Sequence, residues 1–351
     1  MVTLDANPDK LAKNGAAPTA ASTGPADPRR APRPEGRPPE APPSMPPYPH
    51  EHEFSVITVG TGSPDLSLER ACACTMIQHK GSYYVVDAGP GVITSFLRAE
   101  PAPVGPGVTA TAYRWADIAA VLLTHLHQDH TNDYFDVMTY RWVTGGRRVQ
   151  VVGPPGTQRL HDFLVDFYRD DLAYRWLRDR SITEEGMFTG VDVREITGVN
   201  RFGLDEMVVT TAELTHTMYD LGYRFEVNAR SIVVSGDTAY DARLIDLARD
   251  ADILVADCNP LALGPSPPMR PLTDLPEEYL PRGRYRGDPT VPAHAPLRDV
   301  IAMARDAGVG KLVCTHLMPT PFDEAATRER FAAGGFEGDV VFGVDGLEIV
   351  P

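Results

Sequence analysis

Short hydrophobic runs separated by turn residues recur along the chain from residue 54 onward. Phe54–Gly60 alternates larger apolar residues with small or polar ones, which is typical of a strand, and the Gly, Ser and Pro after it predict a turn. In the first half, the same criteria predict further strands over 71–78, 83–87, 118–124 and 148–152, and helices over 92–100, 131–142 and 157–169. In the second half they predict strands over 191–197, 206–214, 221–227, 231–235, 253–257 and 311–315, helices over 242–250, 296–307 and 324–333, and two short final strands.

Each half begins with consecutive strands and continues with alternating strands and helices. This order is typical of an α/β fold and is consistent with a four-layer αβ/βα sandwich, in which two sheets face each other between helices. Two stretches show no clear periodicity. Residues 170–189 are rich in charges and aromatics and could form a lid or a substrate wall, whereas 259–293 is dense in Pro, Arg and Gly. Loops of that length are usually functional or mobile.

Residues 1–53 form a separate segment by composition. They contain 13 of the 33 prolines and almost no apolar side chain larger than alanine. Such a segment cannot bury enough surface to offset its loss of conformational entropy. We therefore expect a disordered, partly polyproline N-terminal tail, followed by one folded domain over 54–351.

The most distinctive stretch follows the predicted strand 118–124, where His125, His127, Asp129 and His130 stand within six positions. Two residues apart, His125 and His127 can point to the same side of an extended turn, while Asp129 and His130 turn to the other side. One loop can thus offer ligands to two metal ions. Imidazole and carboxylate ligands without thiolate suit Zn²⁺, or a similar divalent ion, at a catalytic site that keeps a position open for water.

Further candidate ligands follow other predicted strands. His216, Asp237 and His316 each come directly after a strand, and His294 precedes a helix. Polar side chains just past a buried strand are positioned for chemistry more often than those inside it. Together with the loop, six of the ten histidines join one pattern. A polar surface loop with incidental histidines is therefore the weaker interpretation.

The His-x-His-x-Asp-His motif at the end of a strand resembles the signature of the metallo-β-lactamase superfamily. Gly60–Pro64 and Asp87–Gly91 look like two further landmarks of that superfamily, and the resemblance covers roughly residues 54–351. It implies a metallo-β-lactamase αβ/βα sandwich with the site where the two sheets meet at one edge. It also suggests that a homodimer is possible. Asp87 closes a strand beside a glycine turn, where a carboxylate is usually structural, so we expect it to support the metal loop through hydrogen bonds.

The resemblance also implies a ligand set for two ions. His125, His127 and His216 would bind one ion, Asp129, His130 and His316 the other, and Asp237 would bridge them. We expect two Zn²⁺ per chain, with Mn²⁺ or Fe²⁺ as alternatives. A pair of ions about 3.5–4 Å apart can hold a hydroxide that attacks the substrate, because a bound metal lowers the pKa of water to about 7.

Within the superfamily, the chain is most similar to the branch of tRNase Z and its arylsulfatase-like and phosphodiesterase-like relatives. In that branch a histidine before a helix donates a proton to the leaving group and is oriented by an acidic residue. His294 and Asp257 fall at the matching positions, although Asp257 stands where Glu is more usual and Ala295-Pro296 replaces a small hydroxyl pair. We therefore expect Asp129, His294 and Asp257 to be catalytic.

The chain is acidic, with 33 Lys and Arg against 48 Asp and Glu and a net charge of −15. The tail holds 6 basic and 7 acidic residues, which leaves about −14 on the folded domain. Broad binding to nucleic-acid phosphates needs a basic surface, although a local basic groove remains possible. In addition, Val227 to Ser231 leaves no room for the long arm with which tRNase Z grips tRNA. Both observations argue against tRNA and favour a small-molecule ester.

The four cysteines are too few and too scattered for a disulfide scaffold, and free thiols suggest a reducing compartment. No apolar run approaches 18 residues and the N-terminus lacks the apolar core of an export signal, so neither a membrane span nor secretion is expected. These features favour a cytoplasmic protein.

Three functions fit the sequence. The first is a dinuclear zinc hydrolase that cleaves a phosphodiester, a sulfate ester or a related bond, with His294 as proton donor. The second is a lactonase or β-lactamase type acyl hydrolase, in which Tyr240, three residues after Asp237, would hold the substrate carbonyl. For Tyr240 we favour instead a helix-start aromatic that packs against the sheet. The third is a non-catalytic scaffold that recruits partners through the tail, which is disfavoured because no ligand is missing.

Overall fold

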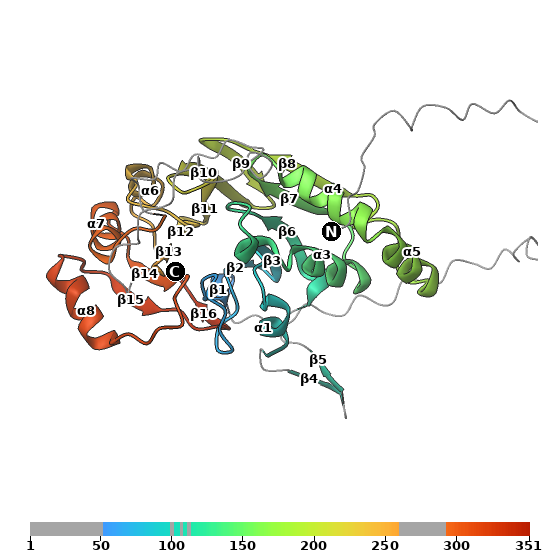
Figure 1. Ribbon diagram of the computed structural model, residues 1–351, viewed down its shortest axis with the longest axis horizontal. Coiled ribbons are helices and arrows are strands. Elements are labelled where there is room, and N and C mark those ends of the chain that lie inside the picture. Colours follow the sequence, from blue (N-terminus) through green and yellow to red (C-terminus); the bar gives the residue numbers. More distant parts are fainter. Residues whose placement is uncertain (1–51, 99–101, 106–107, 111–113, 260–292) are drawn as a thin grey trace, which may run out of the picture. The chain divides into compact units, whose positions relative to one another are not determined.

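The alternating hydrophobic runs form two mixed sheets of seven strands each (Figure 1). The computed structural model describes residues 52–98, 102–105, 108–110, 114–259 and 293–351, all within the unit 43–351. The first sheet has the order β16-β1-β2-β3-β6-β7-β8, with β1 Phe54–Gly60, β2 Cys74–His79, β3 Ser82–Val86, β6 Ile118–Leu122, β7 Val149–Gly153, β8 Val191–Glu195 and β16 Leu347–Ile349.

The second sheet has the order β15-β14-β13-β12-β11-β10-β9. Its strands are β9 Asn200–Leu204, β10 Met207–Leu214, β11 Asp220–Val227, β12 Arg230–Val234, β13 Ile253–Asp257, β14 Lys311–Thr315 and β15 Asp339–Phe342. Strands β12 to β15 run parallel, as do β3, β6, β7 and β8 in the first sheet. A small hairpin of β4 Ala102–Gly105 and β5 Val108–Ala110 stands apart from both sheets.

Eight α-helices lie in the described part of the chain. They are α1 Val92–Arg98, α2 Gln128–Thr131, α3 Tyr134–Val143, α4 Thr157–Phe167, α5 Arg169–Arg178, α6 Ala242–Leu247, α7 Leu297–Ala307 and α8 Glu324–Ala333, with a 3₁₀ turn, η3, at Trp115–Asp117. None of the helices in these ranges is both long and apolar enough to cross a membrane.

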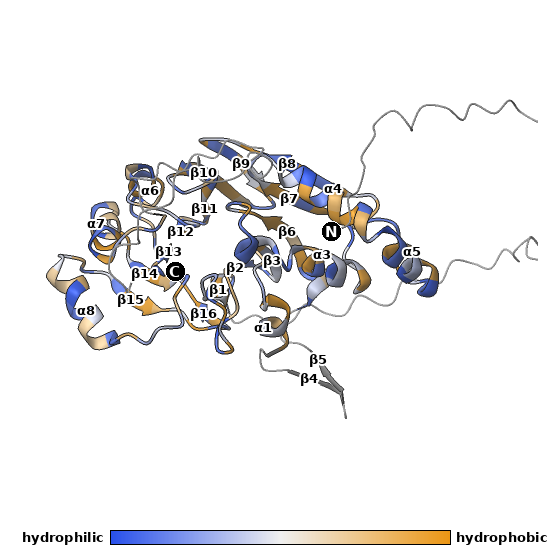
Figure 2. Cartoon of the chain, in the orientation of Figure 1, coloured by the Kyte–Doolittle hydropathy of each residue, from blue (hydrophilic) through white to orange (hydrophobic). Residues whose placement is uncertain are grey.

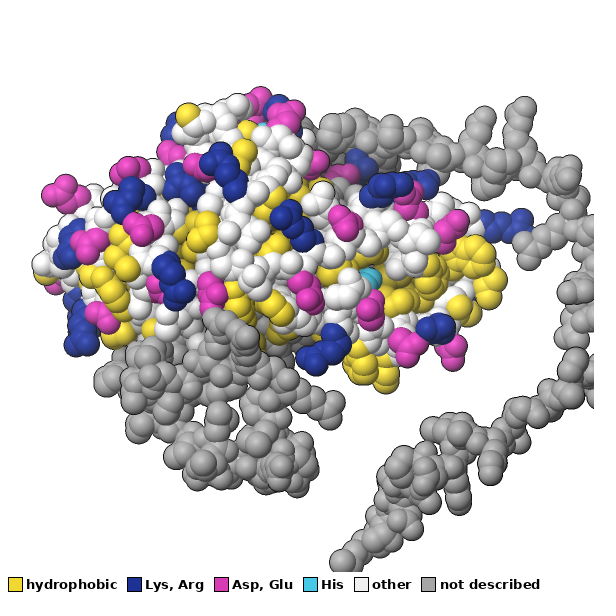
Figure 3. Space-filling model, turned by 90° about the horizontal axis from the view of Figure 1, so that it is seen from above, with side chains coloured by type: hydrophobic (Ala, Val, Ile, Leu, Met, Phe, Trp, Pro, Cys, Tyr) yellow, Lys and Arg dark blue, Asp and Glu magenta, His cyan; other side chains and the backbone are white. Residues whose placement is uncertain are grey.

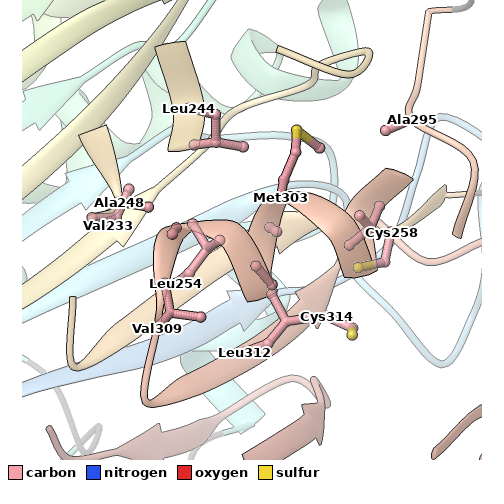
Figure 4. Close-up of a cluster of buried hydrophobic side chains, with 14 of the residues drawn as sticks. Val233, Leu244, Ala248, Leu254, Cys258, Ala295, Met303, Val309, Leu312 and Cys314 are labelled. Carbon is pink, nitrogen blue, oxygen red and sulfur yellow. The ribbon is translucent and has the colours of Figure 1, made fainter. Parts of the chain in front are cut away.

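Three hydrophobic clusters show how the layers are stacked. The cluster between the sheets joins Val56, Leu122, Phe225 and Val255, among others, from both sheets. A second cluster lies between the first sheet and α1, α3 and α4, and a third lies between the second sheet and α6, α7 and α8. Figure 4 shows the third, with Met303 of α7 directed toward α6. This is the four-layer αβ/βα sandwich that the sequence predicts.

Central strands are buried on both faces, which explains their sequences. In β6, Val121 packs under the helices of the first sheet while Ala120 and Leu122 face the second sheet. Figure 2 shows hydrophobic residues concentrated on strands such as β6 and β7, whereas α4 and α5 carry both hydrophobic and hydrophilic residues. A strand buried on both sides needs a continuous apolar run, and this is what 118–123 provides.

The element predictions are confirmed with a few differences. The helix predicted over 131–142 is two helices, α2 and α3, and α2 begins at the metal loop. The stretch 170–189 contains α5, a mostly polar helix in which Asp171 and Arg175 form an i,i+4 ion pair (2.6 Å). Strand β9 is a half-exposed edge strand that the sequence analysis missed. The tail and nearly all of 259–293 lie outside the described residues.

Candidate metal centre

The loop 125–130 begins where β6 leaves the first sheet, and it is held by Asp87. That carboxylate follows β3, the neighbour of β6, and accepts hydrogen bonds from the Thr124 amide (2.8 Å), the Thr124 hydroxyl (2.7 Å) and His130 Nδ1 (2.8 Å). Gly89 follows closely, and a Cβ there would lie 1.9 Å from the Asp129 carbonyl oxygen. The turn after β3 therefore fixes both the backbone and one histidine of the loop.

Ligand-type residues of the second sheet reach the same point from the carboxyl ends of alternate strands. His216 follows β10, Asp237 follows β12, and His316 follows β14. In the Ser235-Gly236-Asp237 turn, Gly236 has φ of 64°, and a Cβ there would lie 2.5 Å from the Asp220 carboxylate. Only glycine fits this position, so the turn that places Asp237 depends on it.

Two residues of the site hold an unfavourable backbone conformation. Asp87 has φ of 62° and His316 has φ of 57°, in the left-handed region of backbone conformation that residues other than glycine rarely adopt. Backbone strain of this kind persists where the surrounding structure fixes it, and it gathers at functional sites. Both residues directly follow a strand and line the same small cavity.

The structure brings all seven predicted ligand residues together in two groups that share Asp237. One group is His125, His127, His216 and Asp237, and the other is Asp129, His130, His316 and Asp237. In each group the ligand atoms lie within 4.8 Å of one another. This division matches the one that the family resemblance implies. Asp237 also belongs to a third, overlapping group with Asp257, His294 and His316.

The distances fit tetrahedral coordination in the second group. His316 Nε2 lies 3.3 Å from both Asp129 Oδ2 and Asp237 Oδ2, and His130 Nε2 lies 3.4 Å from Asp237 Oδ2. Bonds of about 2.0–2.1 Å around a tetrahedral ion separate the ligand atoms by roughly 3.3–3.4 Å. His130 Nε2 is buried and has no hydrogen-bond partner, as expected of a nitrogen whose lone pair is kept for a metal. The residues therefore fit divalent ions.

Each histidine of the two groups has a partner for its other ring nitrogen. His125 Nδ1 lies 2.9 Å from the Thr124 hydroxyl and 3.1 Å from Asp220 Oδ1, and His216 Nδ1 lies 2.9 Å from the Ala293 carbonyl oxygen. The remaining partners are Thr217 for His127 and Asp87 for His130, and the acceptor nearest to His316 Nδ1 is Asp257 Oδ1 at 3.6 Å. Outer partners of this kind fix ring orientation and tautomer in metal sites.

Burial and charge set the protonation of the cluster. Burial holds the pKa of His125 and His216 below the ordinary value and lowers that of His127 to about 4, so these imidazoles are neutral ligands at neutral pH. Burial disfavours an ionised Asp237, but His316 and His130 outweigh it and hold its pKa well below the usual range. A buried aspartate that stays ionised can serve as a ligand shared by two metal ions.

His294 and Asp257 form a pair at the edge of the two groups. His294 Nδ1 lies 2.7 Å from Asp257 Oδ2, and the His294 ring stacks on His316 with centroids 5.2 Å apart. Burial lowers the pKa of His294, but the Asp257 carboxylate outweighs it and raises this pKa to about 9. Asp257 is fixed in turn by the Asn259 amide at 2.9 Å. His294 and Asp257, which were paired on the basis of the resemblance, thus lie within hydrogen-bond distance of each other.

A small cavity of about 30 Å³ lies at the meeting point of the sheets. Its lining includes Asp87, His130, Asp237, Asp257 and His316. The space suits an ion or one or two waters among polar partners. Tyr240, by contrast, is 48% exposed and precedes α6, so the expectation that it packs against the sheet is wrong.

Asp220 is the residue that the sequence analysis missed. It is fully buried at the start of β11, and neither of its carboxylate oxygens accepts a well-aligned hydrogen bond from a side chain. Burial raises its pKa well above the usual range, and the nearby Asp237 and Asp87 add to this. A carboxylate within a buried strand, four residues after His216, was the available signal.

Comparisons with known proteins agree with this architecture. A model of the beta-lactamase superfamily domain matches residues 83–317. A Ribonuclease Z of Mycolicibacterium paratuberculosis is 31% identical over 297 residues, which cover 83% of this chain and 95% of that protein. The metallo-beta-lactamase fold protein YhfI from Bacillus subtilis has the same fold, with a TM-score of 0.60 at 18% identity over 84% of this chain and 98% of that one. Human tRNase Z, short form, gives a TM-score of 0.55 at 18% identity, with coverage of 84% and 98%.

The similarity to Ribonuclease Z overturns the expectation that tRNA is not a substrate. The net charge is a sum over the whole surface and does not exclude a local basic site. Near the start of β6, a cavity of about 480 Å³ is lined by Lys80, Arg114, Arg141, Arg147 and Arg148, among other residues. The β11–β12 connection is indeed a tight turn, but a missing insertion there does not exclude RNA.

Proposed function

The chain belongs to the metallo-β-lactamase superfamily, and from this premise we propose that it is a metal-dependent phosphodiester hydrolase that acts on RNA, including tRNA. The relatives named Ribonuclease Z support the bond and the substrate class, because their similarity extends over 83% of this chain. Sulfate esters, which the sequence analysis kept as an option, have no such support.

The observation that carries the proposal is the position of His294. Its ring lies beside both candidate metal groups, with centroids 5.6 Å from His216 and 5.2 Å from His316. Because Asp257 engages Nδ1, Nε2 is the ring atom that can face a substrate. A hydrolase that cleaves a phosphodiester to a poorly stabilised alkoxide needs a proton donor at this place, and general acids contribute about 10²–10⁴-fold.

The other residues have defined roles in the proposal. His125, His127 and His216 would hold one ion, Asp129, His130 and His316 the other, and Asp237 both. When bound, two divalent ions supply Lewis-acid chemistry: they activate water and stabilise charge on the phosphate oxygens. Asp257 keeps His294 in one tautomer, with the proton of Nδ1 directed to its carboxylate. We propose Zn²⁺ as the ion and the pair as the active form.

His294→Ala tests the role of the proton donor. Purified, zinc-loaded protein is assayed on a tRNA transcript, a single-stranded RNA, bis(p-nitrophenyl) phosphate, an aryl sulfate and a lactone. We expect RNA cleavage to fall by about 10²–10⁴-fold, whereas p-nitrophenolate release falls far less, because a good leaving group needs no proton. Metal content, measured by elemental analysis, stays unchanged.

The control is His161→Ala, which changes a buried histidine on α4 that contacts Tyr134 and not the metal groups. An equal loss on RNA and on the p-nitrophenyl ester would contradict proton donation by His294. Hydrolysis of the lactone alone, lost on Tyr240→Phe, would instead support the acyl hydrolase.

A further inference from the structure

Basic side chains gather around the cavity of about 480 Å³ at the amino-terminal ends of β3 and β6. Five basic residues line it: Lys80, Arg114, Arg141, Arg147 and Arg148. We call these five residues the basic cluster. Among the described residues that line the cavity, the only carboxylate is Asp117, which lies 3.2 Å from Arg114. On the face shown in Figure 3, by contrast, basic and acidic side chains are interspersed. In a chain with a net charge of −15, five basic residues around one cavity point to an anionic ligand.

Arg141 is the buried member of the basic cluster. It is only 2% exposed, and its guanidinium donates to the carbonyl oxygens of Ile118, Arg147 and Arg148. Burial lowers the pKa of Arg141 to about 10, and no carboxylate in the described part of the chain counteracts this. Burying a cation without a counter-charge costs free energy. An anion in the cavity would supply the missing charge.

The exposed members of the cluster have weak partners. Glu185 lies 2.9 Å from Arg148 and 3.9 Å from Arg147, so two arginines share one carboxylate. Lys80 pairs with Glu206 at 2.5 Å, and both side chains are largely exposed to solvent. Exposed ion pairs of this kind stabilise a protein little, so these cations are available to a ligand. Each guanidinium offers several N–H donors in the planar arrangement that matches two oxygens of a phosphate.

The cavity is separate from the candidate metal centre. Ser82 and Ile118, the first residues of β3 and β6, line the cavity, whereas Asp87 and His125 come after the last residues of the same strands. The seven residues of mostly extended chain from Ile118 to His125 span roughly 20 Å. Helix α3 runs in the same direction, because it begins after the metal loop and carries Arg141 near its end. A ligand in the cavity is therefore distinct from a group bound at the metal centre.

Size and charge together define the class of ligand. Pockets for small ligands have volumes of about 300–1,000 Å³, and this cavity falls within that range. A phosphate group carries up to two negative charges and several acceptor oxygens, so it can engage more than one arginine at once. We propose that the basic cluster binds a phosphate group, carried by a free phosphate compound or by RNA, at a site remote from the metal centre. Arg147 and Arg148 contact the phosphate oxygens, and Arg141 supplies positive charge from behind them.

Isothermal titration of inorganic phosphate into the full-length, zinc-loaded protein tests the proposal. Phosphate that binds at the metal centre contributes equally to the wild type and to a variant of the cavity, so the difference between them reports the cavity. In the double variant Arg147→Ala and Arg148→Ala, which we call the cavity variant, we expect this phosphate site to weaken by about tenfold or more. The backbone carbonyls that accept hydrogen bonds from Arg141 remain in the cavity variant, so its melting temperature should change little.

The matched control is Arg230→Ala with Arg249→Ala, which removes the same two positive charges from exposed ion pairs elsewhere (side chains 56% and 58% exposed). It should bind phosphate like the wild type. Equal phosphate binding by the wild type and the cavity variant overturns the proposal. An equal loss in the control also overturns it, because the effect would then reflect net charge alone.

A fluorescently labelled oligouridylate without a terminal phosphate separates the two sources of the phosphate group. If the cavity variant binds it about tenfold more weakly and inorganic phosphate displaces it from the wild type, the cavity holds a phosphate of the RNA backbone. If the cavity variant loses affinity for inorganic phosphate but keeps its affinity for RNA, the ligand is a free phosphate compound. Neither measurement depends on catalysis, so the proposal stands or falls separately from the reaction proposed for the metal centre.

Discussion

Two buried carboxylates flank the loop 125–130, one from each sheet, and they are satisfied very differently. Asp87, after β3 of the first sheet, accepts three hydrogen bonds, two from Thr124 and one from His130. Asp220, at the start of β11 in the second sheet, has His125 Nδ1 at 3.1 Å and no well-aligned side-chain hydrogen bond.

The difference separates two tasks that a carboxylate can have in a metal site. Asp87 fixes the loop backbone as well as a histidine, so it contributes to folding and to the site. Burying Asp220 without comparable compensation costs free energy, and such a group persists where function requires it. We infer that Asp220 serves to orient His125 and adds nothing to stability.

Asp87→Ala should produce the largest effect among the outer residues. It removes three hydrogen bonds and leaves the buried Thr124 amide without its acceptor, so we expect the free energy of unfolding to fall by about 2–4 kcal/mol. Zinc affinity should fall by about 10–100-fold as well. Chemical denaturation and competition with a chromogenic chelator measure the two quantities. An unchanged stability would show that the loop is held by other contacts.

Asp220→Asn should lower the affinity for zinc without lowering the free energy of unfolding. Asparagine keeps the shape but replaces one carboxyl oxygen with an amide nitrogen, so the orientation of His125 weakens and zinc affinity falls by about tenfold. The free energy of unfolding should be unchanged or higher, because the raised pKa of Asp220 means that its burial at neutral pH requires proton uptake, which asparagine does not need. The same two assays apply. A loss of stability comparable to that of Asp87→Ala would make Asp220 a structural residue like its counterpart.

Thr217→Ala should have the smallest effect. Among the described residues, the partner of His127 Nε2 is the Thr217 hydroxyl at 3.3 Å, and the ring is partly accessible to solvent, so water can replace the hydroxyl. We expect a change in zinc affinity of no more than about threefold, below the range for carboxylate partners. Isothermal titration with zinc resolves a change of this size, and a tenfold loss would place Thr217 with the two carboxylates.

Most of the fold and the loop half of the site could be predicted from local patterns in the sequence. Strands such as β1, β13 and β14 and helix α8 have the predicted bounds, because a strand buried on both faces, or a capped helix, leaves a local pattern. The loop 125–130 could be predicted for the same reason. Its four ligand-type residues lie within six positions, so the metal-binding pattern is visible in a short stretch of sequence.

The remaining features depend on contacts between distant parts of the chain. His216, Asp237, Asp257 and His316 are single residues at the ends of four strands, and their convergence on the loop follows from the pairing of β10 to β14 in one sheet and from the packing of that sheet on the other. Asp220 looked like an ordinary strand residue, and Arg141 looked like a surface residue of a helix. The acidic net charge led to the wrong expectation that tRNA is not a substrate. Convergence, burial and the placement of charge are properties of residues far apart in the chain, and a linear pattern records only what lies close together.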